Sequence, residues 1–432
     1  MKHRRRYLSR RWASVATTSL VSSLLISSSV FAAESSLPSI PATAVPIVTG
    51  SILPSPHLSE ISVQVVPATY GKSSSSYSAS AQAATPPTGI SLEQLNGPLP
   101  PVITMVNATT GWAFDGTHFL HTTDGGRQWT NVTPPGMTVH LDRSSNSARN
   151  TVWDFQSAQS TWIAEATNLS GTVLLSHTVD GGQRWIQHTI QFSGISQFGA
   201  ISALGFVNAR QGWLEWGMTD LWKTENGGAS WQPAVITKVR GLPPGGGGLV
   251  TFINARTGWM LWSAGGNPGP QFFLKRTTNG AHSWHQVPIS FIRGLMAYGF
   301  PTFTGSAGLL ACMREFGGLV VLRTQNGGKR WEGVSPTIPN RGDTSEDSWG
   351  IKTVGGMVAW ALAEGRLWRS TNGARSWTYR SSDRFLVHAS GMDFLNAQMG
   401  WVWKATPTGI THVWMTTSGG RHWTSWQPVI RP

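Results

Sequence analysis

Thr122-Thr123-Asp124-Gly125-Gly126-Arg127-Gln128-Trp129 is the first of seven similar octapeptides in this 432-residue chain. Six further octapeptides repeat its pattern: Thr or Ser first, Asp, Asn or Ser third, Gly fourth and Trp last. They begin at Thr178, Thr224, Thr277, Thr324, Ser370 and Thr416. Their closing tryptophans follow one another at intervals of 56, 46, 53, 47, 46 and 46 residues. A period this regular indicates one structural unit repeated seven times.

A second element precedes each octapeptide by 17 to 25 residues, and its clearest copies are Phe206 to Trp213 and Phe252 to Trp259. Short apolar runs separated by Asn and Gly turns predict four strands in each unit. Four strands in about 48 residues is typical of a propeller blade. The sequence therefore predicts an all-β, seven-bladed propeller of four-stranded blades over residues 98–432. The repeat suggests complete blades, although a strand from the preceding spacer could still complete one of them.

The octapeptide is expected to be the turn between the third and fourth strands. Its hydroxyl and its third side chain can accept hydrogen bonds from turn amides, and its Gly supplies a positive φ. Asn and Ser replace Asp in five copies, which keeps the acceptor and discards the charge. A structural role is thus predicted for Asp124, Asp180, Asn226, Asn279, Asn326, Asn372 and Ser418. The closing tryptophans are expected to be buried between blades: Trp129, Trp185, Trp231, Trp284, Trp331, Trp377 and Trp423.

The octapeptide resembles the Asp-box, or bacterial neuraminidase repeat, of sialidases, sortilin-type receptors and several glycoside hydrolases. Together with the Gly-Trp element it is most similar to the photosystem II stability/assembly factor family of seven-bladed propellers. The resemblance covers about residues 98–432 and implies a binding or assembly scaffold. This chain departs from the pattern at Ala281 and Ala374, which stand where the second Gly is usual. The Gly-Trp element has also decayed in blades two and five.

The N-terminus has the layout of a secretory signal peptide over residues 1–32. A basic segment precedes an apolar, Ser-rich stretch, and Val30-Phe31-Ala32 offers a cleavage site. Arg4-Arg5-Arg6 partly resembles a twin-arginine signal, so either export route stays open. Residues 33–97, rich in Ser, Pro and Ala, are expected to be a disordered linker. We therefore expect a secreted or envelope-associated protein, with no transmembrane segment once the signal is cleaved.

Removing the signal takes away six basic residues and no acidic ones, which lowers the formal net charge from +13 to +7. The mature chain stays basic, but no nucleic-acid-binding module is recognisable, so no nucleic acid partner is expected. The single cysteine, Cys312, excludes an intrachain disulfide and reads as a small buried hydrophobe. No metal site, no cofactor and a monomer are expected.

Catalysis is the alternative to binding, as a sialidase-like or other glycoside hydrolase. Sialidases carry an arginine in an N-terminal Arg-Ile-Pro element, but here that stretch reads Pro100-Pro101-Val102-Ile103-Thr104. Paired carboxylates are the requirement of most glycosidases, and the few candidates are Glu165, Glu215, Glu315 and Glu364. The sequence therefore favours a protein that is not an enzyme and has no catalytic residues.

Basic residues recur at two positions of the repeat, just before the octapeptide and just before its Trp. Equivalent positions in a propeller form rings, so these cations are expected to crowd the rim of one face. The residues singled out for binding are Arg276, Arg323, Lys329, Arg330, Arg369 and Arg375. Such a rim would attract a protein partner or an anionic envelope polymer. A solvated surface in a basic protein is the plainer interpretation.

Overall fold

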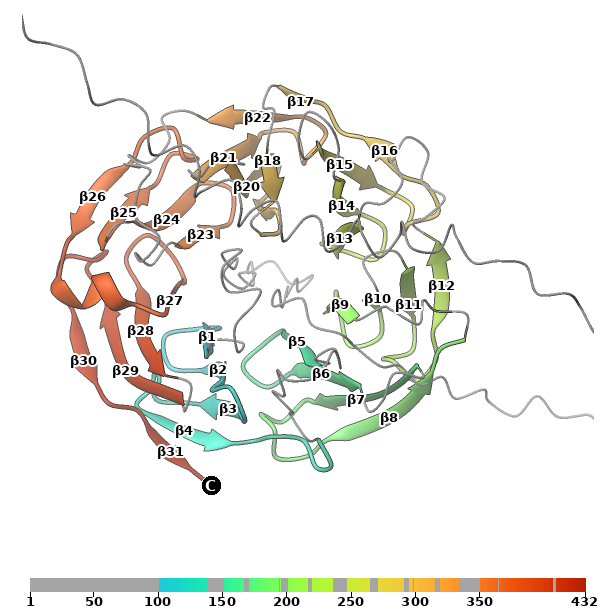
Figure 1. The fold of residues 1–432 in the computed structure, drawn as a ribbon, viewed down its shortest axis with the longest axis horizontal. Helices are drawn as coiled ribbons and strands as arrows, with labels where there is room; N and C mark the ends of the chain where they lie inside the picture. Colours follow the sequence, from blue (N-terminus) through green and yellow to red (C-terminus); the bar gives the residue numbers. More distant parts are fainter. Residues whose placement is uncertain are drawn as a thin grey trace, which may run out of the picture.

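The computed structural model describes residues 101–137, 151–166, 171–193, 195, 201–216, 220–235, 247–264, 271–290, 295–297, 299–314, 319–334, 350–363, 365–406 and 409–432. Their strands form seven sheets arranged in a ring, as Figure 1 shows. The predicted signal peptide and linker lie outside the described residues. Among the described residues no helix is long and apolar enough to cross a membrane.

Each sheet is one blade, and its four strands follow one another in sequence from the centre of the ring outward. Blade 1 contains β1 (Val102–Met105), β2 (Gly111–Phe114), β3 (Phe119–Thr122) and β4 (Gln128–Asn131). Blade 2 contains β5 (Thr151–Phe155), β6 (Thr161–Ala166), β7 (Thr172–Thr178) and β8 (Ile186–Gln191). Blade 3 contains β9 (Ile201–Phe206), β10 (Gly212–Trp216), β11 (Asp220–Thr224) and β12 (Gln232–Val235). Blade 4 contains β13 (Gly247–Phe252), β14 (Gly258–Ala264), β15 (Gln271–Thr277) and β16 (His285–Gln286).

Blades 6 and 7 repeat this plan, and blade 5 varies it. In blade 5 two short strands, β18 (Leu295–Ala297) and β19 (Thr302–Thr304), share the inner position beside β20 (Ala307–Arg314), followed by β21 (Leu319–Thr324) and β22 (Trp331–Val334). Blade 6 contains β23 (Gly350–Val354), β24 (Val358–Ala363), β25 (Arg366–Ser370) and β26 (Thr378–Ser381). A 3-10 helix, η3 (Arg384–His388), leads to blade 7: β27 (Gly391–Phe394), β28 (Gly400–Thr406), β29 (Gly409–Thr416) and β30 (Thr424–Trp426).

Two short strands lie outside this plan, each parallel to the outermost strand of the next blade. β17 (Ile289–Ser290) leaves blade 4 and pairs with β22, while β31 (Val429–Arg431) leaves blade 7 and pairs with β4. In the second pair Ile430 lies opposite Trp129. Every blade is therefore built from one continuous segment, and the last residues of the chain fasten blade 7 to blade 1 from the outside.

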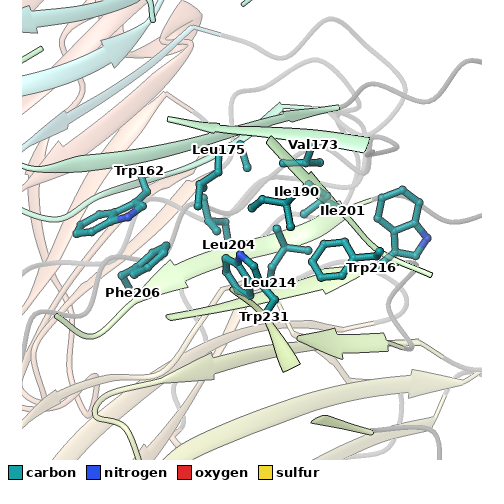
Figure 2. Packing of buried hydrophobic residues seen from close by; sticks show 12 residues of the cluster. Trp162, Val173, Leu175, Ile190, Ile201, Leu204, Phe206, Leu214, Trp216 and Trp231 are labelled. Atoms are coloured by element: carbon teal, nitrogen blue, oxygen red, sulfur yellow. The ribbon is translucent and has the colours of Figure 1, made fainter. Parts of the chain in front are cut away.

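The core is divided among the seven junctions between neighbouring blades. Seven clusters of buried apolar residues occur, and each draws its members from two consecutive blades, including blades 7 and 1. Figure 2 shows the cluster between blades 2 and 3, where Trp162 stacks on Phe206 with ring centroids 4.2 Å apart. Because the inner strands bury both faces against neighbouring blades, β2 and β10 are buried at every position, whereas outermost strands such as β4, β8 and β30 are polar and largely exposed. The ring is closed, with seven blades as the repeat predicts.

Tryptophans of the Gly-Trp element are the most deeply buried. Trp112, Trp162, Trp259, Trp360 and Trp401 are fully inaccessible to solvent. The octapeptide tryptophans are less uniform than expected. Trp129, Trp231 and Trp331 are buried, whereas Trp185, Trp284, Trp377 and Trp423 are only partly buried. The expectation of burial between blades is met fully by three of the seven, and the other four pack against the inter-blade clusters while remaining partly exposed.

Candidate binding face

The octapeptides form turns at one end of the ring, which we call the turn face. Successive strands of a blade run antiparallel, so the turn after its first strand reaches the same end. In every blade the amide of the fourth octapeptide residue donates a hydrogen bond to a carbonyl of that first turn. The seven donors are Gly125, Gly181, Gly227, Gly280, Gly327, Gly373 and Gly419, at 2.7 to 2.9 Å. The turn face is thus a ring of paired turns, each pair locked by a backbone hydrogen bond.

Within the octapeptide the polar side chains bond to the turn itself. Gly126 N donates to Thr122 Oγ1 at 3.1 Å, and the amides of Arg127 and Gln128 donate to Asp124 Oδ1 at 2.9 Å. The hydrogen bond from the Arg184 amide lowers the pKa of Asp180. Asn326 Oδ1 accepts the equivalent bond from Arg330 N at 3.0 Å without a charge. The Asp and Asn side chains therefore stabilise the turn by accepting hydrogen bonds from its backbone amides.

In blade 5 glycine is required at the fifth octapeptide position by the preceding blade, and its positive φ also favours glycine. A Cβ on Gly328 (φ 75°) would lie 2.5 Å from Trp259 Cζ2 of blade 4. Blade 6 carries Ala374 at this position with a φ of 63°, and blade 5 offers Leu309 in place of the tryptophan. Leu309 and Ala374 share one buried cluster. At this junction the smaller leucine leaves the space that the alanine methyl fills. Ala281 of blade 4 has no such account, because it shares a buried cluster with Trp213 of blade 3.

The basic position just before the octapeptide points into the junctions between blades. Lys223 Nζ of blade 3 donates to Gly280 O of blade 4 at 2.9 Å, and Arg369 Nη1 of blade 6 donates to Ala397 O of blade 7 at 2.6 Å. Arg276 lies over the Trp259 ring with its guanidinium carbon 5.6 Å from the centroid. These side chains are half-buried, and burial lowers the pKa of each. Lys223 and Arg369 connect blades, Arg276 packs on a tryptophan of its own blade, and all three expose only part of their charge.

Arg323 is predicted from the sequence to be a binding residue on the rim, and this prediction is wrong because its side chain is buried. Its side chain is 4% exposed and lies 4.0 Å from the carboxylate of Glu332, which follows the octapeptide on the neighbouring strand β22. A guanidinium held in this position offers almost no surface to a partner. The periodicity placed Arg323 in the right ring of positions, but that ring lies between the blades instead of on their rim.

Exposed cations remain on the turn face, at least one in each blade. They lie in the octapeptides and in the turns after the first strands: Arg127, Arg184, Arg210, Arg256, Lys329, Arg330, Arg375 and Arg421. Three of the predicted binding residues, Lys329, Arg330 and Arg375, are in this set. Arg210 and Arg256 could have been found in the sequence, because Asn-Ala-Arg occupies the same turn in blades 3 and 4.

Carboxylates occur in these turns only in blades 1 to 3, as Asp124, Asp180 and Glu225. Blades 1 to 3 thus carry three exposed cations against three carboxylates. Blades 4 to 7 carry five exposed cations and no carboxylate in the same turns. We call Arg256, Lys329, Arg330, Arg375 and Arg421 the cationic arc. The charge of the turn face is therefore concentrated on one side of the ring.

The carboxylates considered for catalysis are either buried or undescribed. Glu215 is fully buried and accepts a hydrogen bond from Val250 N of the next blade at 3.1 Å. Glu165 is 5% exposed. Glu315 and Glu364 lie outside the described residues. Within the described part of the chain no group of three His, Cys, Asp or Glu side chains could hold a metal ion.

Buried acids that the sequence did not single out connect the inner strands. Asp154 of blade 2 accepts a hydrogen bond from Phe206 N of blade 3 at 2.7 Å, and burial raises its pKa well above the usual range. Asp393 of blade 7 occupies the equivalent place, accepts from Met105 N of blade 1 at 2.8 Å, and lies 2.5 Å from Lys352 Nζ of blade 6. Both carboxylates join neighbouring blades near the centre of the ring.

No protein-family model matches the chain, and no curated protein matches it. Solved structures that it resembles include YCF48 bound to a D1 peptide, with 16% identity over 82% of this chain and 97% of that one and a TM-score of 0.47. YCF48 from Cyanidioschyzon merolae matches with 16% identity over 80% and 98% and a TM-score of 0.45. A GH74 xyloglucanase from Xanthomonas campestris matches with 14% identity over 74% of this chain and 52% of that one and a TM-score of 0.49.

These neighbours include the photosystem II assembly factor whose family the sequence motifs resemble. These three identities are below 25% and the three TM-scores are below 0.5, so the matches carry no argument about the function of this chain.

Proposed function

We propose that this chain is an exported, non-catalytic scaffold that binds an anionic polymer of the cell envelope along the cationic arc. The observation that carries the proposal is the uneven charge of the turn face. Five exposed cations stand in the described turns of blades 4 to 7, which hold no carboxylate, although the exposed Glu332 follows directly after the blade 5 octapeptide. The three cations of blades 1 to 3 are matched by three carboxylates in the turns themselves. Fields of like charges on one surface add and attract an extended anion.

The rigidity of the turn face supports the same role. Each arc residue stands in one of two neighbouring turns that a backbone hydrogen bond joins. Hydrogen bonds from the side chains of Lys223, Arg369 and Trp360 to backbone carbonyls also connect the turns of one blade to the next. A surface that is already ordered loses little conformational entropy when it binds. The backbone positions that carry the cations are therefore fixed before a partner arrives.

An anionic polymer suits this surface better than a folded protein does. Protein interfaces depend on buried aromatic and apolar anchors at their centres. Over blades 4 to 7, Met357 is the one strongly exposed large apolar side chain in the described turns. Export rests on the signal-like segment of residues 1–32, which would bring the propeller to the envelope, where such polymers occur.

Two charge-matched variants test the proposal. The arc variant carries Arg256→Gln, Lys329→Gln and Arg375→Gln, and the control carries Arg127→Gln, Arg184→Gln and Arg210→Gln. Both lose three exposed cations, so their net charge is equal. Each is applied to immobilised long-chain polyphosphate and to envelope fragments, and eluted with a salt gradient.

Wild type and the control should be retained and should elute progressively as salt rises, since exposed charges are screened over about 8 Å at physiological ionic strength. The arc variant should elute at clearly lower salt, with the dependence of log K on log salt reduced by about 1 for each cation removed. Equal elution of the two variants would refute the proposal. Retention that ignores salt would also refute it, and capture of a protein instead of a polymer would identify a different partner.

A further inference from the structure

Two arginines of blade 6 converge on one pair of turns in blade 7. Arg369, at the end of β25, donates through Nη1 to Ala397 O at 2.6 Å. Arg380, on the neighbouring strand β26, donates through Nε to Gly419 O at 2.6 Å and through Nη2 to Ser418 O at 3.4 Å. The amide of Gly419 bonds to the turn containing Ala397, through Gln398 O at 2.7 Å. The two guanidinium groups thus lie against the same locked pair of turns.

Glycine makes this approach possible. A Cβ on Gly419 (φ 66°) would lie 2.6 Å from Arg369 Nη1, and one on Gly420 (φ 78°) would lie 3.3 Å from Arg380 Cβ. Both arginine side chains therefore pack directly on the backbone of the blade 7 octapeptide. The next residue of that octapeptide is Arg421, which is exposed. Three arginines from two blades meet at this junction, and we call them the arginine cluster.

The cluster has an excess of positive charge that the described residues leave uncompensated. Burial lowers the pKa of Arg369 and of Arg380, and repulsion from Arg421 lowers both further. No carboxylate in the described part of the chain forms an ion pair with any of the three. The blade 7 octapeptide has no carboxylate at its third position, because Ser418 stands where blades 1 and 2 have Asp124 and Asp180.

Donors remain for an anion. Each guanidinium has five N–H groups, and the bonds just described occupy one in Arg369 and two in Arg380. Planar guanidinium groups bind phosphate oxygens in pairs, with charge-assisted hydrogen bonds. A phosphate presents more acceptor oxygens and more charge than a carboxylate, which suits three converging arginines.

We propose that the arginine cluster of Arg369, Arg380 and Arg421 is a binding site for a phosphate group at the junction of blades 6 and 7. The proposal deepens the proposed function and rests on it, since the phosphate would belong to the polymer lying along the cationic arc. The cluster is the place where the polymer is anchored, and the other arc residues add attraction that is less specific. Free phosphate and a phosphodiester polymer carry the same group, and both can be tested.

The test places in blade 7 the carboxylate that blades 1 and 2 already have. Ser418→Asp restores the residue type of Asp124 and Asp180, so the turn should keep its hydrogen bonds while gaining a negative charge beside Arg380. Asn226→Asp in blade 3 is the matched control, because it makes a similar octapeptide far from the cluster. Arg421→Gln is the second variant, since its side chain is exposed and its loss should leave the fold intact.

Binding of inorganic pyrophosphate to the mature protein is measured by titration calorimetry, and polymer binding with polyphosphate and polyglutamate of equal length. Wild type and Asn226→Asp should bind pyrophosphate within twofold of each other, and Ser418→Asp and Arg421→Gln at least fivefold more weakly. The same two variants should bind polyphosphate more weakly to a similar degree, whereas their binding of polyglutamate should change little. Equal pyrophosphate affinity in all four proteins would overturn the proposal, and so would equal loss for the two polymers. Salt-sensitive polymer binding that is lost in the variant of Arg256, Lys329 and Arg375 but kept in Ser418→Asp and Arg421→Gln would overturn the phosphate site and leave the proposed function standing.

Discussion

Removing the tryptophan of the Gly-Trp element should destabilise the ring more than removing the octapeptide tryptophan of the same blade. Trp401 of blade 7 is fully buried against blade 1, and its indole N–H donates to Gly125 O at 3.0 Å. Trp423 is partly buried, and its indole nitrogen has no hydrogen-bond partner among the described residues. The two side chains are chemically identical and lie 22 residues apart in one blade.

The expected losses follow from these environments. Trp401→Ala removes a complete core side chain, at about 3–5 kcal/mol, and leaves the Gly125 carbonyl without its donor, at about 1–3 kcal/mol. We therefore expect a loss of about 4–8 kcal/mol for Trp401→Ala and a clearly smaller loss for Trp423→Ala, whose side chain is only partly buried and makes no such bond. Trp401→Phe, which keeps an aromatic ring and loses the hydrogen bond, should lie between about 1 and 3 kcal/mol.

Equilibrium unfolding in guanidinium chloride measures the difference, provided that the slope against denaturant is the same for all variants. The midpoint should fall furthest for Trp401→Ala. Equal losses for the two alanine variants, or a larger loss for Trp423→Ala, would refute the view that the ring is held mainly by the Gly-Trp tryptophans.

Three further predictions concern single positions. Leu309→Trp should destabilise the protein by about 1–3 kcal/mol, because the larger side chain overpacks the junction between blades 5 and 6. When Ala374→Gly removes the methyl group that the new tryptophan would meet, the loss should be smaller by at least about 1 kcal/mol, and a double-mutant cycle measures this difference. Burial, and secondarily His188, lowers the pKa of His177 to about 4, so the unfolded chain takes up the proton first. The free energy of unfolding should therefore be highest above about pH 6.5 and should decline as the pH falls towards 4. In unfolding measured at several pH values, His177→Phe should reduce this decline. Cys312 is fully buried and burial raises its pKa, so iodoacetamide should label it only in denaturant, and rapid labelling of the native protein would contradict its position.

The sequence was sufficient for the architecture because the octapeptide is a local structure. Its hydroxyl, acceptor and glycine satisfy a single turn, so each copy can be recognised without its neighbours, and the spacing then gives the blade and the number of blades. Cys312 was correctly placed in the core for a similarly local reason, its apolar surroundings in the chain.

Contacts between blades were beyond the sequence. Arg323 and Arg375 both occupy repeated basic positions, yet one is buried and the other exposed, because the residue before the octapeptide ends a strand facing the next blade. Arg380 belongs to neither basic position and was not considered, although it meets Arg369 at the blade 7 turns. β31 is too short to be recognised from its pattern, and its pairing with β4 depends on the ring being closed already.

An anionic partner lying across the turns of blades 4 to 7 should shield the backbone amides of those turns from solvent. Amide hydrogen exchange of the protein, measured with and without fragments of the cell envelope, reports this shielding segment by segment. We expect slower exchange in residues 253–257, 324–331, 370–377 and 416–423, and no change in residues 122–129, 178–185 and 224–231. Protection spread evenly over all seven octapeptides, or confined to the loops at the opposite end of the ring, would contradict the account.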